Sequence, residues 1–270
     1  TNNDTTTRLS VHTAGTQSDD VSYRPRISAD GRYVVFSSNA TNLVPGDTNA
    51  LRDIFMRDTQ ANVTSRISQD TAGNQALGGW SFSPAINADG RYVTFYSEAT
   101  NLVAGDSNAV TDVFLRDTLA GVTTRVSTDS SDTESNGTSA LPEISADGRF
   151  IVFDSVATNL VGSDTNTVKD VFVKDSWTGA TVRLSVTGGG SGGNAQSHTA
   201  AISADAAYVV FDSDANNLVA GDSNSTTDVY RAVQTLFSPD TDGDGLRDDI
   251  EASLGTNINL ADSDADGISD

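Results

Sequence analysis

The sequence of 270 residues has no cysteine, a single methionine and only two lysines. Without cysteine the chain has neither a disulfide framework nor a thiol nucleophile. No apolar run approaches the ~18 residues that a membrane-spanning helix needs. The two histidines, His12 and His198, lie in different contexts, and the sequence contains neither a Gly-x-Ser-x-Gly elbow nor a His-Glu-x-x-His zinc pair. These absences predict a protein that is not an enzyme.

Basic residues are also few. The formal net charge is −21 and the pI is near 4.1, which argues against nucleic acid and anionic membrane surfaces as partners. Part of this charge is local, because residues 240–270 hold ten Asp and Glu against one Arg. The change in composition predicts a boundary near Ser238–Pro239, with one domain over residues 1–237 and an acidic tail over residues 238–270.

The first domain is an internal repeat. The segment Ile27–Phe36 returns at Ile86, Ile144 and Ile202, in steps of 58 or 59 residues. A Gly-Asp or Ser-Asp pair followed by a second Asp keeps the same step, and so does an Arg-apolar-Ser triplet. The triplets begin at Arg8, Arg66, Arg125 and Arg183. Three landmarks in phase define repeats near residues 8–66, 66–125, 125–183 and 183–233.

Each repeat predicts four short strands. Ala-Asp-Gly marks a tight turn, and Tyr33–Phe36 is typical of a buried strand. Further strands follow at Asp53–Asp58 and Val63–Ser68, and a four-stranded unit of this length is typical of a propeller blade. Thr5–Val11 resembles only a fourth strand, which the last repeat lacks. We therefore expect an all-β, four-bladed propeller closed by the N-terminal strand 5–11. The alternative is a larger ring that two chains or a missing segment supply.

The repeat resembles TolB-type, WD-like propeller repeats. The matching residues in the first copy are Ser28–Arg32, Asp53–Phe55 and Arg66–Ser68. The resemblance covers roughly residues 5–233 and implies the fold without implying a function. This sequence departs from the family pattern in its longer loops and in its fourth unit, where Ala206–Ala207 replaces Gly-Arg.

The acidic tail contains the strongest chemical motif. Asp240–Glu251 matches a calcium loop, in which alternating oxygens surround the ion and Gly245 permits the bend. A second copy begins at Asp262, but its closing ligand would lie beyond Asp270. The predicted calcium ligands are Asp240, Asp242, Asp244, Leu246, Asp248, Glu251, Asp262, Asp264, Asp266, Ile268 and Asp270. The pair of loops resembles thrombospondin type 3 repeats, which implies a calcium-stiffened stalk; a solvated, disordered linker is the alternative.

The long blade loops contain a second group of oxygen donors. In the first blade these are Asp47, Asn49 and Asp53, and each later blade repeats the pattern. One interpretation is a calcium ion in every blade. The other is structural, with Asp and Asn accepting backbone N–H bonds in turns. Recurrence in all blades favours the structural interpretation, because a scaffold needs the same turn four times.

A ligand site is expected where the repeats differ. The first strands line a propeller's channel, and aligning them gives three columns that break the symmetry. These columns are Tyr23, Phe82, Ala140 and His198; Arg24, Ser83, Leu141 and Thr199; and Arg26, Ala85, Glu143 and Ala201. Trp80, with Phe82 and Tyr23, is a candidate sugar-stacking face, and blade-to-blade packing is the alternative role for these rings.

Together these features predict a monomeric, extracellular or cell-surface protein, with the periplasm as the alternative location. We expect it to bind Ca²⁺ and to act as a binding or scaffold module for a protein or polysaccharide. The alternative function is a carbohydrate-active enzyme, a glycoside hydrolase or lyase, that uses carboxylates in the channel.

Overall fold

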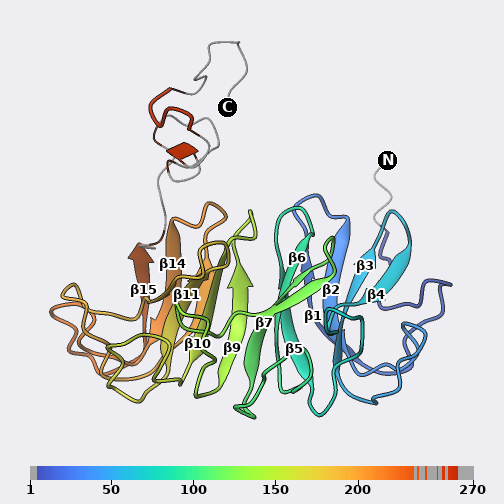
Figure 1. Ribbon diagram of the computed structural model, residues 1–270, viewed down its shortest axis with the longest axis horizontal. Helices are drawn as coiled ribbons and strands as arrows, with labels where there is room; N and C mark the ends of the chain where they lie inside the picture. Colours follow the sequence, from blue (N-terminus) through green and yellow to red (C-terminus); the bar gives the residue numbers. More distant parts are fainter. Residues whose placement is uncertain are drawn as a thin grey trace.

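The computed structural model describes residues 5–233, 236, 241, 248, 251–252 and 255–260. Within these residues the chain forms four antiparallel sheets, one from each repeat (Figure 1). Blade 1 is β1 (Ser22–Ile27), β2 (Tyr33–Ser38), β3 (Asp53–Asp58) and β4 (Val63–Arg66). Blade 2 is β5 (Ser81–Ile86), β6 (Tyr92–Ser97), β7 (Asp112–Asp117) and β8 (Val122–Arg125). Blade 3 is β9 (Ser139–Ile144), β10 (Phe150–Ser155), β11 (Asp170–Asp175) and β12 (Thr181–Arg183), and blade 4 is β13 (Ser197–Ile202), β14 (Tyr208–Ser213) and β15 (Asp228–Val233).

The Ala-Asp-Gly segment forms the predicted turn between the first two strands. The Ser28 hydroxyl donates to the Asp30 carboxylate at 2.6 Å, and that carboxylate accepts the Arg32 amide at 3.0 Å. Gly31 has a φ of 75°, a conformation that costs glycine little. Arg32 then makes a bidentate ion pair with Asp58 at the end of β3, with a shortest distance of 2.7 Å. This ion pair therefore also connects the turn before β2 to the end of β3.

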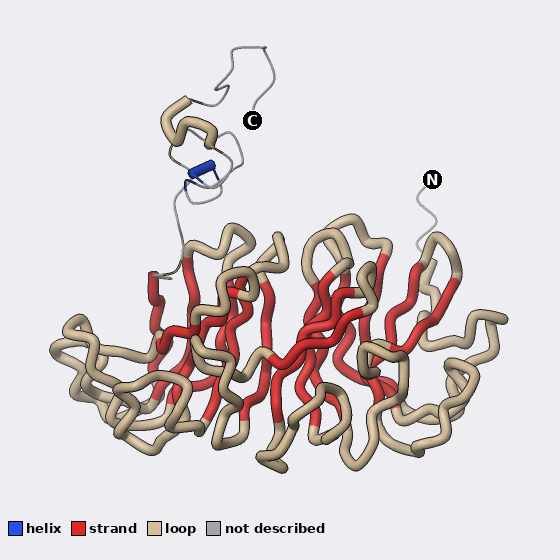
Figure 2. Tube along the Cα trace, viewed as in Figure 1, coloured by secondary structure: helices blue, strands red, loops and turns tan. Residues whose placement is uncertain are grey.

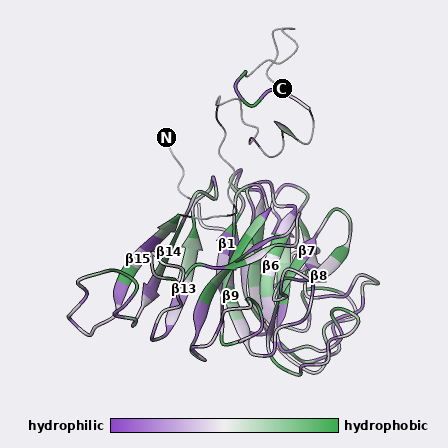
Figure 3. Cartoon of the chain, turned by 60° about the vertical axis from the view of Figure 1, so that its left-hand side comes forward, coloured by the Kyte–Doolittle hydropathy of each residue, from purple (hydrophilic) through white to green (hydrophobic). Residues whose placement is uncertain are grey.

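The hydrophobic core lies between the blades. Val35 and Ile54 of blade 1 pack with Val93 and Phe95 of blade 2, and equivalent clusters join blade 2 to blade 3 and blade 3 to blade 4. Figure 3 shows the corresponding hydrophobic stretches along strands such as β6. Because side chains alternate along each strand, each blade has apolar side chains on both of its faces. Every blade therefore needs a neighbouring blade on each side to bury them.

The structure confirms an all-β propeller fold of four units, but it shows no closed ring. The blades form an open arc with β15 at one end and β3 and β4 at the other, joined by long loops (Figures 1 and 2). In the described residues the fourth sheet has the order β13-β14-β15 and contains no N-terminal strand. The predicted boundary near residue 237 stays a prediction.

The N-terminal segment Thr5–Val11 packs against blade 1. It is not a regular strand, and its only β-bridge joins Val11 to Gln17. The Val11 carbonyl accepts the Thr64 hydroxyl at 2.6 Å, as the Gln69 carbonyl accepts the Thr123 hydroxyl one blade later. The segment therefore stands against blade 1 as the end of a preceding blade would, which explains why its sequence resembles a fourth strand.

Candidate ligand-binding site on the inner strands

Most of the predicted calcium ligands lie outside the described residues. These are Asp240, Asp242, Asp244, Leu246, Asp262, Asp264, Asp266, Ile268 and Asp270. Of the two that are described, Asp248 accepts the Thr241 amide at 2.9 Å and its hydroxyl at 2.8 Å, and Glu251 is fully buried. Within the described part of the chain, no three His, Cys, Asp or Glu side chains form a group that could hold a metal. No helix there is long and apolar enough to span a membrane.

The acidic residues of the blade loops surround an arginine. In blade 1 the Arg66 guanidinium lies 3.6 Å from Asp47 and 3.5 Å from Asp53. Burial raises the pKa of Asp53 to about 6, while hydrogen bonds from Ser68 and Asn49 and the charge of Arg66 oppose this rise. A positive side chain thus already occupies the space between the two carboxylates.

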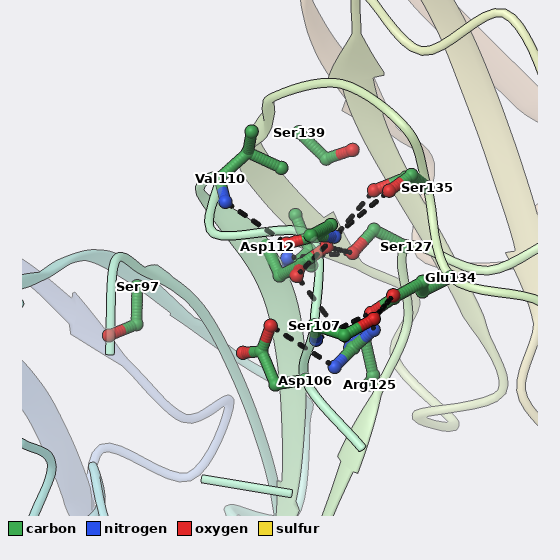
Figure 4. A network of polar contacts seen from close by, with 12 residues as sticks. Ser97, Asp106, Ser107, Val110, Asp112, Arg125, Ser127, Glu134, Ser135 and Ser139 are labelled. Carbon is green, nitrogen blue, oxygen red and sulfur yellow. Dashed lines mark hydrogen bonds and ion pairs between the residues drawn. The ribbon is translucent and has the colours of Figure 1, made fainter. Parts of the chain in front are cut away.

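The same network recurs in blade 2 (Figure 4). Arg125 lies 3.5 Å from Asp106 and 3.6 Å from Asp112, and it also pairs with Glu134. Asp112 accepts the Ser127 hydroxyl at 2.6 Å and the Ser135 hydroxyl at 3.0 Å. In blade 3 the guanidinium of Arg183 takes the same place. These contacts favour the structural interpretation of the loops in blades 1 to 3. The pairing was missed in the sequence, although the Arg and both Asp keep the same repeat step.

The inner strands bring the symmetry-breaking aromatic residues together. The guanidinium carbon of Arg52 lies 4.8 Å from the ring centre of Tyr23, 5.3 Å from that of Trp80 and 5.1 Å from that of Phe82. Phe82 also stacks on Tyr96 with ring centres 5.1 Å apart. Tyr23 and Trp80 are 42% and 45% exposed, so this cluster of rings is open to solvent.

Arg52 differs from Arg66, Arg125 and Arg183, each of which pairs with two aspartates of its own blade. The Arg52 Nε donates to Asn39 at 2.9 Å, and in the described residues no carboxylate lies within ion-pair distance of it. The equivalent residues in the other blades are Thr111, Lys169 and Thr227. We name Arg52, Tyr23, Trp80, Phe82 and Tyr96 the aromatic patch.

Blades 3 and 4 place charged residues where blade 2 has Tyr96. Asp154 occupies this repeat position in blade 3 and is 1% exposed; burial raises its pKa, and Lys169 at 3.4 Å opposes the rise. In blade 4 the same position is Asp212, whose carboxylate lies 2.9 Å from Nδ1 of His198. Of the predicted column Tyr23, Phe82, Ala140 and His198, the two rings thus belong to the aromatic patch, and His198 pairs with Asp212 of β14.

Glu143 does not face a free channel. Its carboxylate makes a 3.0 Å ion pair with Arg26, which joins the inner strands β9 and β1. Arg26 and Glu143, which belong to the same predicted column, thus neutralise each other.

One cleft in the described part of the chain lies away from the inner strands. It has a volume of about 830 Å³ and is lined by β8, the turn at Thr128–Glu134 and the turn at Lys174–Gly179. The Lys174 ammonium is buried there and donates to oxygens of Thr128, Asp129 and Gly179. The charge of this cleft is therefore used to join blades 2 and 3, and we do not assign the cleft to a ligand.

No protein-family model and no curated protein matches the chain. Several solved structures are similar to the chain in fold. TolB from Acinetobacter baumannii is 17% identical with a TM-score of 0.48, over 80% of this chain and 42% of TolB. The four antiparallel sheets of this chain form a β-propeller fold, and TolB is among the solved structures that resemble it. The propeller domain of the Trilobed protease from Pyrococcus furiosus is 12% identical with a TM-score of 0.47, over 80% of this chain and 55% of that one. Oligogalacturonate lyase from Vibrio parahaemolyticus is 13% identical with a TM-score of 0.44, over 80% of this chain and 54% of the lyase. The chain thus spans less than half of the first TolB.

The prediction that the protein is not an enzyme is wrong, because the missing sequence motifs do not justify it. The similar structures include propellers of peptidases and of a lyase, so the fold occurs within enzymes. These likenesses are distant and partial, and they leave the catalytic status of this chain undetermined. The absence of familiar motifs does not decide it, because function resides in sites and not in folds.

Proposed function

We propose that the chain is a binding module for a carbohydrate that carries carboxylate groups, and that the aromatic patch is its binding site. The observation that carries this proposal is Arg52, a guanidinium held among three aromatic rings without a carboxylate partner in the described residues. Aromatic faces bind the apolar faces of sugar rings, and a guanidinium binds a carboxylate through two parallel hydrogen bonds. The net charge of −21 opposes an acidic ligand only weakly where the acidic residues lie farther than about 8 Å from it, because physiological salt screens charges beyond that distance.

Isothermal titration calorimetry with a trisaccharide of mannuronate and with neutral mannotriose tests this proposal. We expect the acidic sugar to bind more tightly. Trp80→Ala should weaken binding of both sugars about tenfold, as loss of an aromatic contact of about 1.4 kcal/mol would. Arg52→Gln should remove the preference for the acidic sugar. Trp177→Ala is the matched control, since this exposed ring stacks on Arg149 away from the aromatic patch. If neither sugar binds, or if Trp80→Ala binds like the wild type, the proposal fails.

A second candidate function is cleavage of such a sugar, by hydrolysis or elimination. The observation that favours it is the buried Asp154, whose raised pKa is suited to a carboxyl group that delivers a proton. His198 of the next blade contributes to its electrostatic environment and itself lies 2.9 Å from Asp212. Incubation with polymannuronate should then release reducing ends, and Asp154→Asn should abolish the release without weakening binding. Binding without any release would leave only the first function.

We also propose that the tail binds Ca²⁺ and that the protein acts outside the cytoplasm, at the cell surface or in the periplasm. The sequence match of Asp240–Glu251 supports calcium binding, and so does the buried carboxyl group of Glu251. Calcium titration of the full chain should show uptake that Asp242→Ala and Glu251→Gln reduce, whereas Asp89→Asn in a blade turn should not. Fractionation of the source cells tests the location.

A further inference from the structure

The two ends of the arc are complementary, and we infer that blade 4 of one chain docks on the N-terminal end of a second copy. The surface on blade 4 comprises β15 with Tyr208, Val210, Val229, Asp222 and Asp228. The surface at the other end comprises Thr5–Val11 with Ala29 and Gly31. In Figure 1 these surfaces lie at opposite ends of the arc. In this arrangement blade 4 of one copy and blade 1 of the second copy have the same relative position as two neighbouring blades within one chain.

Blade 4 lacks the arginine that every other blade has. Asp222 and Asp228 correspond to Asp164 and Asp170, which hold Arg183 at 3.0 and 3.2 Å. In blade 4 the Tyr230 hydroxyl donates to Asp222 at 2.7 Å, while the other Asp222 oxygen is buried without a hydrogen-bond partner. Burial and this contact raise the pKa of Tyr230 to about 12. The pair of carboxylates is therefore short of one positive charge.

Arg8 is an arginine without carboxylates. It begins the same Arg-apolar-Ser triplet as Arg66, Arg125 and Arg183, and in the described residues its side chain bonds only to Gln17. When Thr5–Val11 takes the place of a fourth strand beside β15, Arg8 comes to Asp222 and Asp228 as its counterparts do in blades 1 to 3. The two ends are thus matched in charge.

Among the residues that the structure describes, no blade covers the apolar face of blade 4. Val229 is 78% exposed, whereas its equivalent in blade 3, Val171, is fully buried. Tyr208 and Val210 are 42% and 41% exposed, whereas Phe150 and Val152 are fully buried. Exposure of this face and of the open edge of β15 costs solubility unless another chain covers them.

A glycine at the other end fits one of these side chains. The ring of Tyr33 lies over Gly90 of the next blade so closely that a Cβ there would be 2.2 Å from it, and Tyr92 lies over Gly148 in the same way. At Gly31 the space above the turn is open, with only Ile27 at 4.0 Å. Within the described residues, no turn follows Tyr208 in this series, and no ring lies over Gly31.

Backbone hydrogen bonds extend the same series. The Ala29 amide donates to the Ala88 carbonyl at 2.9 Å, Ala88 to Ala146 at 3.0 Å, and Ala146 to Ala204 at 3.1 Å. Within the described residues, this series begins at the Ala29 carbonyl and ends at the Ala204 amide. One docking step would therefore supply an ion pair, a ring over a glycine and a backbone bond together.

A second copy fits these ends better than the same chain. Closing the four blades on themselves would require all three packed interfaces between blades to rotate, and their cores are buried. A second copy leaves these interfaces as they are. Two such contacts close a ring of eight blades, within the usual range of propellers, and a step that does not close gives longer chains.

Sedimentation of the full chain at micromolar concentration tests the inference. We expect a wild type of two or more copies, and Val229→Glu and Arg8→Glu as single copies. The matched control is Leu119→Glu, because Leu119 is 79% exposed at a turn of blade 2, like Val229 in exposure but remote from both docking surfaces. Leu119→Glu should assemble like the wild type. Circular dichroism verifies that each variant is folded.

Mixing the two variants separates docking between chains from closure within one chain. The Arg8→Glu chain keeps an intact blade 4, and the Val229→Glu chain keeps an intact N-terminal end. An equimolar mixture should therefore form a complex of one copy of each. A single-copy wild type, an assembly that survives Val229→Glu, or a mixture without the mixed complex would each overturn the inference.

Discussion

Replacing Arg183 with leucine isolates the contribution of the arginine network. The substitution removes a guanidinium that lies 3.0 Å from Asp164 and 3.2 Å from Asp170, whose side chains are 1% and 0% exposed. Loss of one partner from a buried ion pair costs about 3–5 kcal/mol, because the remaining charge has neither partner nor water. Asp170 keeps hydrogen bonds from Ser185 at 2.5 Å and Asn166 at 3.0 Å. The expected loss of unfolding free energy is therefore about 3 kcal/mol, at the lower end of that range.

The loss should depend on pH. Burial already raises the pKa of Asp164, and Arg183 opposes this rise. Removal of Arg183 thus raises that pKa further above its unfolded value of about 4. A carboxyl group with a raised pKa in the folded state binds protons more tightly when folded, so its ionisation lowers stability as pH rises. The cost of Arg183→Leu should be smaller at pH 4 than at pH 7.

Urea unfolding followed by tryptophan fluorescence measures this cost, with Val229→Glu present in every variant to keep the chains apart. Arg8→Leu is the control, because Arg8 starts the same triplet but holds no carboxylate among the described residues. It should change the unfolding free energy by less than about 0.5 kcal/mol. An Arg183→Leu chain that loses less than about 1 kcal/mol at pH 7, or the same amount at both pH values, would refute this account of the network.

Two further substitutions test the turns. Gly90→Ala places a Cβ 2.2 Å from the Tyr33 ring at a φ of +80° and should lower the unfolding free energy by about 2–4 kcal/mol. Gly31→Ala has a φ of +75° but no such ring, so it should lower the unfolding free energy by only about 1 kcal/mol. Equal losses for the two variants in urea unfolding would contradict the proposed contact between Tyr33 and Gly90. Hydrogen bonds from Arg32 hold the pKa of Asp58 at about 2, so its stabilising effect is present above about pH 4 and is lost as pH falls toward 2. The melting temperatures of wild type and Asp58→Asn should therefore converge between pH 5 and pH 2, and a constant difference would contradict this assignment.

The strands and turns could be predicted because their signals are local. The Asp-Gly turn, the β-branched strands and the Asp at the end of β3 each repeat within one blade, and the repeat step fixes their number. The arc could not be predicted in this way. Whether four blades close into a ring depends on the angle between neighbouring sheets. Small differences in side-chain volume at each interface determine this angle. The expected closing strand Thr5–Val11 accordingly has the right sequence but lies at the opposite end from β15.

The candidate site was predictable only in part. Aligning the repeats correctly identified Tyr23, Phe82 and His198 as positions that differ between blades. It did not identify Arg52, because this residue precedes the third strand and joins the aromatic patch only through folding. Comparison of the residue before each Asp-apolar-aromatic strand would have shown that blade 1 has an arginine where blades 2 and 4 have threonine.

Positions that stay the same in every blade and positions that vary should respond differently to mutation. The repeated Arg and Asp side chains are buried and pair with one another, so Arg125→Leu should lower stability as Arg183→Leu does. The varied rings, such as Trp80, are half exposed and form no part of these networks. Trp80→Ala should therefore weaken sugar binding while changing the unfolding free energy by less than about 1 kcal/mol. If Trp80→Ala unfolds as readily as Arg125→Leu, the rings serve blade-to-blade packing, and the differences between the repeats do not mark a binding site.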